Sequence, residues 1–285
     1  MSVAEIIKQP ERRRNISFDA EYVMEKQAGN VDISGFKSSF QEKTDEILDT
    51  NTLRKLELVK NIQGATYPTH ALILLSDDDI RNTLFPFAKI ECARFKGTRP
   101  DEFIDRKSIR SHIASQPEEA YQFVLRHINE SAAVHGVYTI NRWEYPVKAI
   151  REVIRNAVVH RDYALTGRDI KLAIYDDMVE VTSPGLPPPS IDFSDMESRQ
   201  SDVRNKIIAP VFRRLGLIDQ WGNGLKIIAG ELKNYPEIAF QWREIGMSFQ
   251  IQFIKRSAVS TRNKSDTQIE ETDGIGNFHG RGKTN

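Results

Sequence analysis

The sequence predicts an α+β fold, in which helices and β-strands share one buried core. Two patterns carry this prediction. Residues 149–158 place apolar side chains three and four positions apart, as an amphipathic helix does. Residues 169–175 and 178–183 are two β-rich runs separated by Asp176 and Asp177, which is typical of a hairpin. Hydrophobic residues make up 39% of the 285 residues, enough to bury a sizeable core.

Residues 1–62 are predicted to form a helical N-terminal segment. Apolar residues recur at helical spacing over 18–26, and a second helix is expected to begin near Asn51 and to end before Gly64. The run 70–76 that follows is short and continuously apolar, so its pattern fits a buried strand as well as the start of a buried helix. The pattern alone leaves that choice open.

The main domain is expected to span residues 63–255. Alternating runs predict its strands, and amphipathic runs predict its helices. In chain order these are a strand over 87–97, a helix over 117–131, a strand over 138–146, a helix over 146–160, the hairpin over 169–183, helices over 203–215 and 224–233, and a strand over 247–255. Residues 256–285 lack an apolar pattern and are rich in polar residues and glycine, so we expect a disordered tail.

The composition and charge argue against several classes of protein. The net charge is zero, so nucleic-acid binding would need a local basic patch, and the short clusters Arg12–Arg14 and Arg213–Arg214 are expected to be solvated. The one cysteine, Cys92, lies in an alternating run and is expected to be a small core residue. Without a cysteine pair, and without metal-ligand spacing among the six histidines, no structural zinc is expected.

No targeting or membrane segment is visible in the sequence. No apolar run approaches the ~18–20 residues that span a bilayer. The N-terminus lacks the apolar centre of a signal peptide, so we expect a cytoplasmic protein without membrane contact. The chain also has no G-x4-G-K-[S/T] loop, which argues against a helicase motor of the P-loop type.

The helix over 146–160 carries the strongest candidates for chemistry. Glu152 and Asn156 are four residues apart and therefore lie one above the other on one helix face. An asparagine supplies a neutral oxygen ligand for Mg²⁺ beside a phosphate, and a glutamate can act as a general base toward water. On spacing alone, the alternative that both residues merely solvate the helix face is favoured.

Two turns that contain glycine are further candidates. Gly185 follows the strand that contains Ser183, and a glycine there lets a ligand approach the backbone. Gly222 and Gly224 precede the helix over 224–233, where free amide N–H groups suit a phosphate. Each turn taken alone is more often an ordinary loop. Their order along the chain, after the Glu-x3-Asn helix, makes them a candidate nucleotide site.

This order resembles that of the GHKL ATPases. In those proteins the first helix carries the Mg²⁺-binding asparagine and the catalytic glutamate. The turn after the strand contacts adenine, the following loop is the ATP lid, and the second glycine motif holds phosphates. The resemblance implies a GHKL or Bergerat-like α/β sandwich with a mixed sheet, preceded by a small helical segment. It also implies ATP and Mg²⁺ as ligands.

The resemblance is closer still to the C-terminal region of bacterial Schlafen/AlbA-type transcriptional regulators, often labelled RecG-like ATP-dependent helicases. It extends over residues 17–255 through the segments YPTHALILL, IECARFKG, IREVIRNAVVHRDY, VEVTSPGLPP and RNKIIAPVFRRLGLIDQWGNGLKII. In such proteins an AlbA domain, taken to bind nucleic acid, precedes this region, and a winged helix often follows. We therefore expect a fragment or a truncated paralogue, with DNA contacted through a missing neighbouring domain.

The resemblance implies a role for each motif residue. These are Glu152 as general base, Asn156 as Mg²⁺ ligand, Ser183 and Gly185 on the adenine side, Arg204 and Asn205 as the Arg-Asn pair past the lid, and Gly222 and Gly224 on the phosphate side. Ser183 stands where typical GHKL proteins have an aspartate that reads the adenine amino group, and a serine discriminates less firmly. The sequence assigns no chemical role to the His-Arg-Asp-Tyr signature at 160–163.

Three functions are compatible with these features. The first is an ATP-binding module of a transcriptional regulator, a Mg²⁺-dependent ATPase with binding favoured over fast turnover because no dedicated lysine or arginine finger is evident. The second is a degenerate GHKL fold that serves as an interaction or homodimerisation scaffold without ligand, which Ser183 favours. The third is a DNA-binding regulator that uses residues 36–62 and Arg12–Arg14, against which the zero net charge argues.

Overall fold

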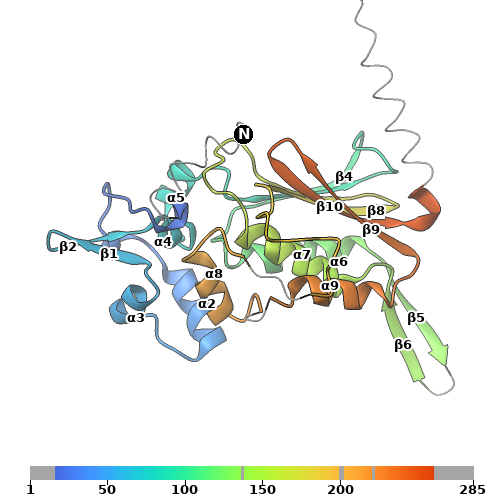
Figure 1. Ribbon diagram of the computed structural model, residues 1–285, viewed down its shortest axis with the longest axis horizontal. Coiled ribbons are helices and arrows are strands. Elements are labelled where there is room, and N and C mark those ends of the chain that lie inside the picture. Colours follow the sequence, from blue (N-terminus) through green and yellow to red (C-terminus); the bar gives the residue numbers. More distant parts are fainter. Residues whose placement is uncertain (1–16, 136–137, 199–201, 220–221, 260–285) are drawn as a thin grey trace, which may run out of the picture.

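The computed structural model describes residues 17–135, 138–198, 202–219 and 222–259, so residues 1–16 of the predicted N-terminal segment and nearly all of the predicted tail lie outside the described residues. Helices and strands surround one central sheet (Figure 1). The elements in chain order are η1 (Phe18–Ala20), η2 (Ala28–Asn30), α2 (Ser34–Thr44), α3 (Thr50–Lys55), β1 (Val59–Ile62), β2 (Ala65–Pro68), α4 (His70–Leu74), α5 (Asp79–Leu84), β3 (Ile90–Phe95), β4 (Phe103–Ile109), α6 (Gln116–His127), β5 (Glu130–His135), β6 (Tyr138–Trp143), α7 (Val147–Val159), β7 (Ile170–Ile174), β8 (Met178–Pro184), α8 (Ile208–Arg214), α9 (Gly224–Leu232), β9 (Ile238–Ile245) and β10 (Ser248–Lys255).

The central sheet has six strands in the order β4-β3-β7-β8-β10-β9. β3 and β7 run parallel, and the other neighbouring strands of this sheet run antiparallel. Parallel neighbours need a crossover connection, and the chain between β3 and β7 supplies one that contains α6 and α7. The sheet is therefore mixed. This confirms the predicted α+β fold, and the arrangement is consistent with a GHKL-like α/β sandwich.

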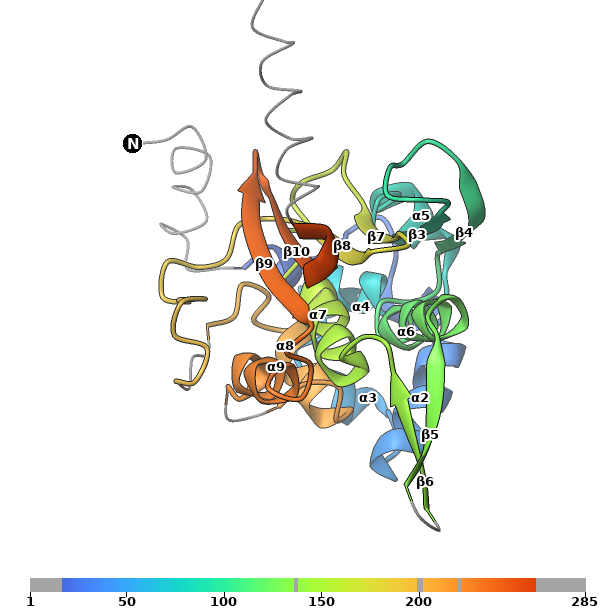
Figure 2. The same ribbon diagram turned by 90° about the vertical axis from the view of Figure 1, so that its right-hand side faces the viewer.

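One face of the sheet is covered by α6 and α7, and α9 packs beside α7 (Figure 1, Figure 2). The predicted apolar stripe of α7 makes this contact: Ile150, Val153, Ile154 and Val158 are at most 2% exposed. Burying an aliphatic side chain of this size contributes roughly 1.5–3 kcal/mol. The stripe therefore fixes α7 against the sheet and leaves its neighbouring face turned toward α9.

The N-terminal segment is joined to the helical layer through a buried carboxylate. Asp19 is fully buried, and its Oδ2 accepts the backbone N–H groups of Ile207 (2.7 Å) and Ile208 (2.8 Å) at the start of α8. N–H groups in the first turn of a helix have no partner within the helix. Phe36 and Phe40 of α2 are also fully buried, in the same apolar cluster as the sheet. Residues from 17 to 62 thus share the core of the rest of the described chain.

The predicted helix over 18–26 is wrong. Only η1 forms, as a short 3-10 turn, and the backbone is then extended. The N–H of Val23 donates to Pro68 O (2.9 Å), and Tyr22 pairs with Thr69. The spacing of the apolar residues matched a helix, but the backbone of this segment hydrogen-bonds to the end of β2 instead of to itself.

The predicted helix between Asn51 and Gly64 is divided into α3 and strand β1. The cap of α3 is Asp49, whose side chain accepts a backbone N–H in the first turn (2.7 Å). The helix ends because Glu57 adopts a left-handed backbone, with φ of 56°. Gln63 and Gly64 both have positive φ and form the two-residue turn between β1 and β2, so Gly64 serves a hairpin and does not stop a helix.

Of the two alternatives for the run 70–76, the structure has the buried helix, α4. Other elements further along the chain differ from the prediction, and the helix predicted over 203–215 begins only with α8. In addition to β1 and β2, the sequence patterns miss strands β4, β5 and β9. Most side chains of β4 and β9, at the two edges of the sheet, are exposed, so these strands lack the alternation that marks a half-buried strand. The strands over 87–97 and 138–146 and the helices over 117–131, 146–160 and 224–233 are confirmed, as are the hairpin and the last strand.

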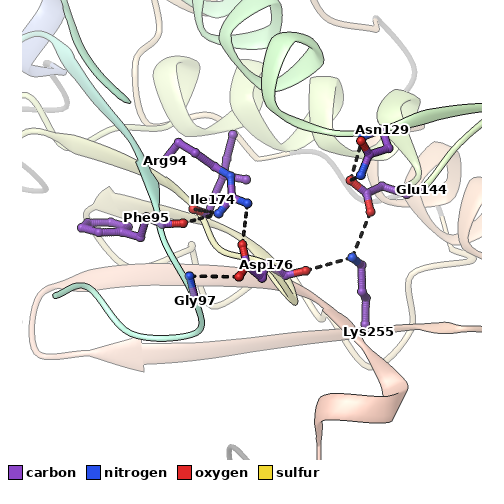
Figure 3. A network of polar contacts seen from close by, with 8 residues as sticks. All are labelled: Arg94, Phe95, Gly97, Asn129, Glu144, Ile174, Asp176 and Lys255. Atoms are coloured by element: carbon purple, nitrogen blue, oxygen red, sulfur yellow. Dashed lines mark hydrogen bonds and ion pairs between the residues drawn. The ribbon is translucent and has the colours of Figure 1, made fainter. Parts of the chain in front are cut away.

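The β5–β6 hairpin projects from the body of the molecule (Figure 1, Figure 2), and an ionic network fixes its base to the sheet (Figure 3). Asp176, in the β7–β8 turn, pairs with Arg94 (Nη2–Oδ1 2.5 Å), and its carbonyl oxygen accepts from Lys255 (2.8 Å). Lys255 also pairs with Glu144 just after β6 (2.9 Å), and Glu144 accepts the N–H of Asn129 (2.7 Å). The turn of the predicted β7–β8 hairpin thus also binds side chains of β3 and β10, and through Lys255 it is linked to the base of the β5–β6 hairpin.

Cys92 lies in the core, as its place in an alternating run predicted. Cys92 is 2% exposed in β3, and burial raises the pKa of its thiol to about 12, so it is the predicted core residue. Within the described residues, none of the helices combines the length and the apolar character that crossing a bilayer requires.

We expect Asp19→Ala to lower the free energy of unfolding by about 1–3 kcal/mol, because two buried N–H groups at the start of α8 would lose their acceptor. Urea denaturation followed by circular dichroism measures this change. Asp101→Ala is the control, because Asp101 is exposed and should change stability by less than about 0.5 kcal/mol. Equal unfolding midpoints for Asp19→Ala and the wild type would contradict the capping role.

Candidate functional site

A cavity of about 160 Å³ lies between α7, the end of β8 and the start of α9, bounded by the loop that follows β8. Its lining contains six of the eight predicted site residues, namely Glu152, Asn156, Ser183, Gly185, Gly222 and Gly224. The structure therefore brings the Glu-x3-Asn pair and both glycine turns to one place. Arg204 and Asn205 are not part of the lining.

Glu152 and Asn156 face the cavity from the middle of α7. Glu152 is only 7% exposed, so it is not one of the solvated surface residues that spacing alone favoured. Asn156 Nδ2 donates to Glu152 Oε1 (3.2 Å), which turns the amide oxygen of Asn156 away from the carboxylate. Burial raises the pKa of Glu152, although the charge of Arg155 opposes this. A buried carboxylate with a raised pKa in a cavity is typical of a functional site.

The start of α9 packs against these two side chains and leaves no room for a side chain of its own. A Cβ atom at Gly224 would lie 2.7 Å from Glu152 Oε1 and 3.3 Å from Asn156 Nδ2. Gly224 is the first residue of α9, where N–H groups lack partners within the helix and the helix dipole favours negative charge. The glycine therefore lets the positive end of α9 approach the Glu152 carboxylate and the adjoining part of the cavity.

Ser183, near the end of β8, has its hydroxyl proton already engaged. Its Oγ donates to the carbonyl oxygen of Ala157 on α7 (2.9 Å), and this bond ties the strand to the helix. The lone pairs of the oxygen remain as acceptor sites. Toward the cavity Ser183 therefore offers an acceptor, the same hydrogen-bonding character as the aspartate of typical GHKL proteins.

Gly185 is required by backbone conformation and by packing. Its φ is +102°, and a Cβ atom there would lie 1.9 Å from Arg204 Nη1. Its N–H donates to Met247 O (2.7 Å). Arg204 fills the space beside the glycine, pairs with Asp162 (3.3 Å) and donates to Leu186 O (2.5 Å). The arginine thereby fixes the beginning of the loop that bounds the cavity.

Asn205 and Arg161 hold the backbone behind the cavity. Asn205 is 1% exposed, and its Nδ2 donates to Val159 O (2.7 Å) and to Arg161 O (2.9 Å). The Arg161 guanidinium is also buried and donates to several backbone carbonyls, among them Phe87 O (3.2 Å) and Arg168 O (2.6 Å). These bonds give the His-Arg-Asp-Tyr signature a structural role. Ligand contact by the Arg-Asn pair stays a prediction.

His160 lines the cavity one helical turn beyond Asn156. Burial lowers the pKa of its imidazole to about 4, and the positive charges of Arg204 and Arg213 act in the same direction, against Asp202. The ring is therefore neutral at pH 7. It forms a polar but uncharged part of the wall.

The loop after β8 is held against the sheet by aromatic contacts. The ring of Phe193 lies 4.7 Å from that of Phe249 and 5.6 Å from that of Trp242, measured between centroids. Phe193 and Phe249 both line the cavity. The loop thus lies where the resemblance places an ATP lid.

Three charged residues of the cavity wall, Asp202, Arg213 and Asp219, were not among the site residues predicted from the sequence. Arg213, expected to be solvated, lines the cavity, and so does Asp219, whose Oδ2 accepts from Asn223 Nδ2 (3.0 Å). Helix geometry alone could have separated Arg213 from Arg214. Successive residues leave a helix about 100° apart, so Arg213 and Arg214 cannot occupy the same face.

A family model described as "Putative ATP-dependent DNA helicase recG C-terminal" (HATPase_c_4) matches residues 167–253. The matched range includes Ser183 and both glycine turns. Helix α7, with Glu152 and Asn156, lies before it. The match suggests an ATPase-like module in this part of the chain, with the use of a nucleotide and Mg²⁺ that such a family implies.

Among solved structures, the chain is similar to the crystal structure of the DIP2311 protein from Corynebacterium diphtheriae. The two share 19% sequence identity with a TM-score of 0.68, over 88% of this chain and 50% of that chain. At this identity the similarity concerns the fold. The present chain spans about half the length of that protein. No curated protein matches the sequence.

We expect Gly224→Ala and Gly230→Ala, both in α9, to have different effects. A Cβ atom at Gly230 would meet nothing within 4 Å beyond its own helix backbone, so alanine there should stabilise the protein by roughly 0.5–1 kcal/mol through its helix propensity. Alanine at Gly224 meets the Glu152 carboxylate and should forfeit that gain. Urea denaturation of both variants measures the difference, and an equal gain would contradict the close packing of α9 on α7.

We expect Glu152→Gln to stabilise the ligand-free protein at neutral pH. The pKa of Glu152 is higher in the folded than in the unfolded state, so the folded state binds the proton more tightly. The wild type must then lose stability as the pH rises from about 4.5 through the folded pKa, and glutamine removes this loss. Thermal unfolding between pH 4 and pH 8 measures it, with Glu118→Gln on the exposed face of α6 as control. A difference between Glu152→Gln and wild type that is constant with pH would count against a raised pKa.

Proposed function

We propose that the chain contains an ATP-binding module whose cavity between α7, β8 and α9 holds the nucleotide together with Mg²⁺. One observation supports this most: the Glu152–Asn156 pair and two glycine turns, far apart in the sequence, line a single cavity. The ATPase-like match over residues 167–253 points to the same ligand.

The residues fit the magnesium and phosphate half of such a ligand. Asn156 would offer its amide oxygen to Mg²⁺, because its amide nitrogen is engaged by Glu152, and Mg²⁺ takes hard oxygen ligands and keeps several waters. The bound ion would neutralise phosphate charge. The N-terminus of α9 would present free N–H groups to phosphate oxygens, and the missing side chain at Gly224 keeps that approach open.

The adenine half of the ligand would lie against Ser183 and Gly185. Because Ser183 offers an acceptor, its partner must be a donor, such as the exocyclic amine of adenine. Guanine places a carbonyl oxygen at the corresponding position, and two acceptors do not bond. Val181, Phe249 and Ile251 supply apolar surface for the base. We therefore expect ATP to bind more tightly than GTP.

Glu152 is the candidate general base for slow hydrolysis. It would take a proton from a water whose oxygen adds to the γ-phosphorus while ADP leaves. A raised pKa makes the ionised carboxylate a stronger base, but a smaller fraction of it is ionised at neutral pH. We propose nucleotide binding as the main function, with turnover secondary to it.

The wider setting of the module rests on the Schlafen/AlbA resemblance. We propose a cytoplasmic transcriptional regulator in which the cavity between α7, β8 and α9 binds the nucleotide and DNA is contacted through a neighbouring domain. A homodimer is part of the same proposal. Sedimentation of the protein with and without ATP would test the dimer directly.

We expect isothermal titration of the wild type with ATP and Mg²⁺ to show saturable binding, weaker with GTP. Asn156→Ala should lower the affinity for Mg²⁺-ATP about 10- to 100-fold, the usual effect of disturbing a metal site. Asn51→Ala, on the exposed side of α3, is the matched control and should bind as the wild type does.

Two outcomes would contradict this proposal. If the folded wild type gives no heat with ATP and Mg²⁺ and shows no thermal shift, the cavity is not a nucleotide site and the ligand-free scaffold is the better account. If the wild type binds ATP but Asn156→Ala binds equally well, the assignment of the Mg²⁺ ligand is wrong while the nucleotide site stands.

A further inference from the structure

Arg213 lies in the last turn of α8 and faces the cavity beside His160 and Asp202. Its neighbour Arg214 leaves the helix in another direction and forms an ion pair with Glu46 outside the cavity. The two arginines are adjacent in sequence but occupy different surroundings. This makes Arg214 a natural control for any role assigned to Arg213.

The charge of the cavity wall is unbalanced around Arg213. Glu152, Asp202 and Asp219 are acidic members of the lining, and His160 is neutral at pH 7. Among the described residues that line the cavity, Arg213 is the one cation. A polyphosphate remains anionic even with one Mg²⁺ bound. A wall with these carboxylates would therefore repel it unless a cation also faced it.

The guanidinium of Arg213 also has a donor without a hydrogen-bond partner. Its Nε is buried and has no hydrogen-bond partner, and no ion pair joins Arg213 to another part of the chain that the structure describes. By contrast, Arg204 pairs with Asp162, and Arg214 with Glu46. Buried N–H donors are almost always paired in native proteins, so an unpaired donor on the wall of a cavity leaves a position where a ligand can supply the missing acceptor.

We infer that Arg213 binds a phosphate group of the nucleotide in this cavity, through its guanidinium group. The inference rests on the proposed function and adds a contact to it, from a helix that belongs to neither glycine turn. An arginine suits this task because its planar donors match the oxygens of a phosphate.

The test is calorimetric titration with ATP, ADP, AMP and adenosine of the wild type, Arg213→Gln and Arg214→Gln. Loss of a charge-assisted hydrogen bond should weaken ATP binding to Arg213→Gln about 10- to 100-fold. Adenosine, which has no phosphate, should bind Arg213→Gln as it binds the wild type. Arg214→Gln should match the wild type for every ligand. The ADP and AMP series shows which phosphate is contacted.

Several results would overturn the inference. Equal losses for ATP and adenosine would mean that Arg213 only shapes the wall, and no loss for ATP would mean that it makes no contact. Failure of the wild type to bind ATP would instead refute the proposed function itself, so the two failures are distinguishable.

A second experiment uses the wild type alone, in case Arg213→Gln does not fold. Phenylglyoxal modifies accessible arginines, and peptide mass spectrometry follows each site. ATP should slow the modification of Arg213, adenosine should not, and Arg214 should react at the same rate throughout. An unchanged rate at Arg213 under saturating ATP would refute the contact.

Discussion

The close contact of α9 with α7 at Gly224 sets the geometry of the cavity. Because Gly224 has no side chain, the positive end of one helix lies directly against the carboxylate of Glu152 on the other. Glu152 is 7% exposed, and burial raises its pKa. Asn156 and His160 follow Glu152 at intervals of one turn, so the face of α7 that the apolar stripe leaves free carries all three side chains to the cavity.

A buried carboxylate is costly, and the surrounding structure offsets that cost. The apolar stripe of α7 fixes the helix on the sheet, and the end of α7 is held by Asn205, Arg161 and Ser183 through hydrogen bonds to backbone carbonyls. Bonds from charged or buried donors to the backbone define position more narrowly than apolar packing does. The His-Arg-Asp-Tyr signature therefore supports the site structurally. Of its four residues, His160 lines the cavity.

The sequence could predict what depends on local pattern and order. Helix α7 and the β7–β8 hairpin follow from residue periodicity, and the order of the motifs along the chain was enough to predict six residues of the cavity lining. Edge strands β4 and β9 were not predicted because most of their side chains are exposed, so the sequence lacks the alternation of apolar and polar residues. Arg213 and Asp219 were not predicted as site residues because α8 and the turn after it reach the cavity through tertiary packing. Local helix geometry showed only that Arg213 and Arg214 face different directions.

The cap that Asp19 provides for α8 also constrains the order of folding. Its partners lie 188 and 189 residues further along the chain, so forming these bonds closes a very long loop. A contact of such sequence separation forms slowly, and during synthesis α8 emerges long after Asp19. The wall of the cavity that carries Arg213 can therefore be completed only after residues 207–214 have been synthesised, and a nascent chain cannot present a finished cavity to any ligand before then.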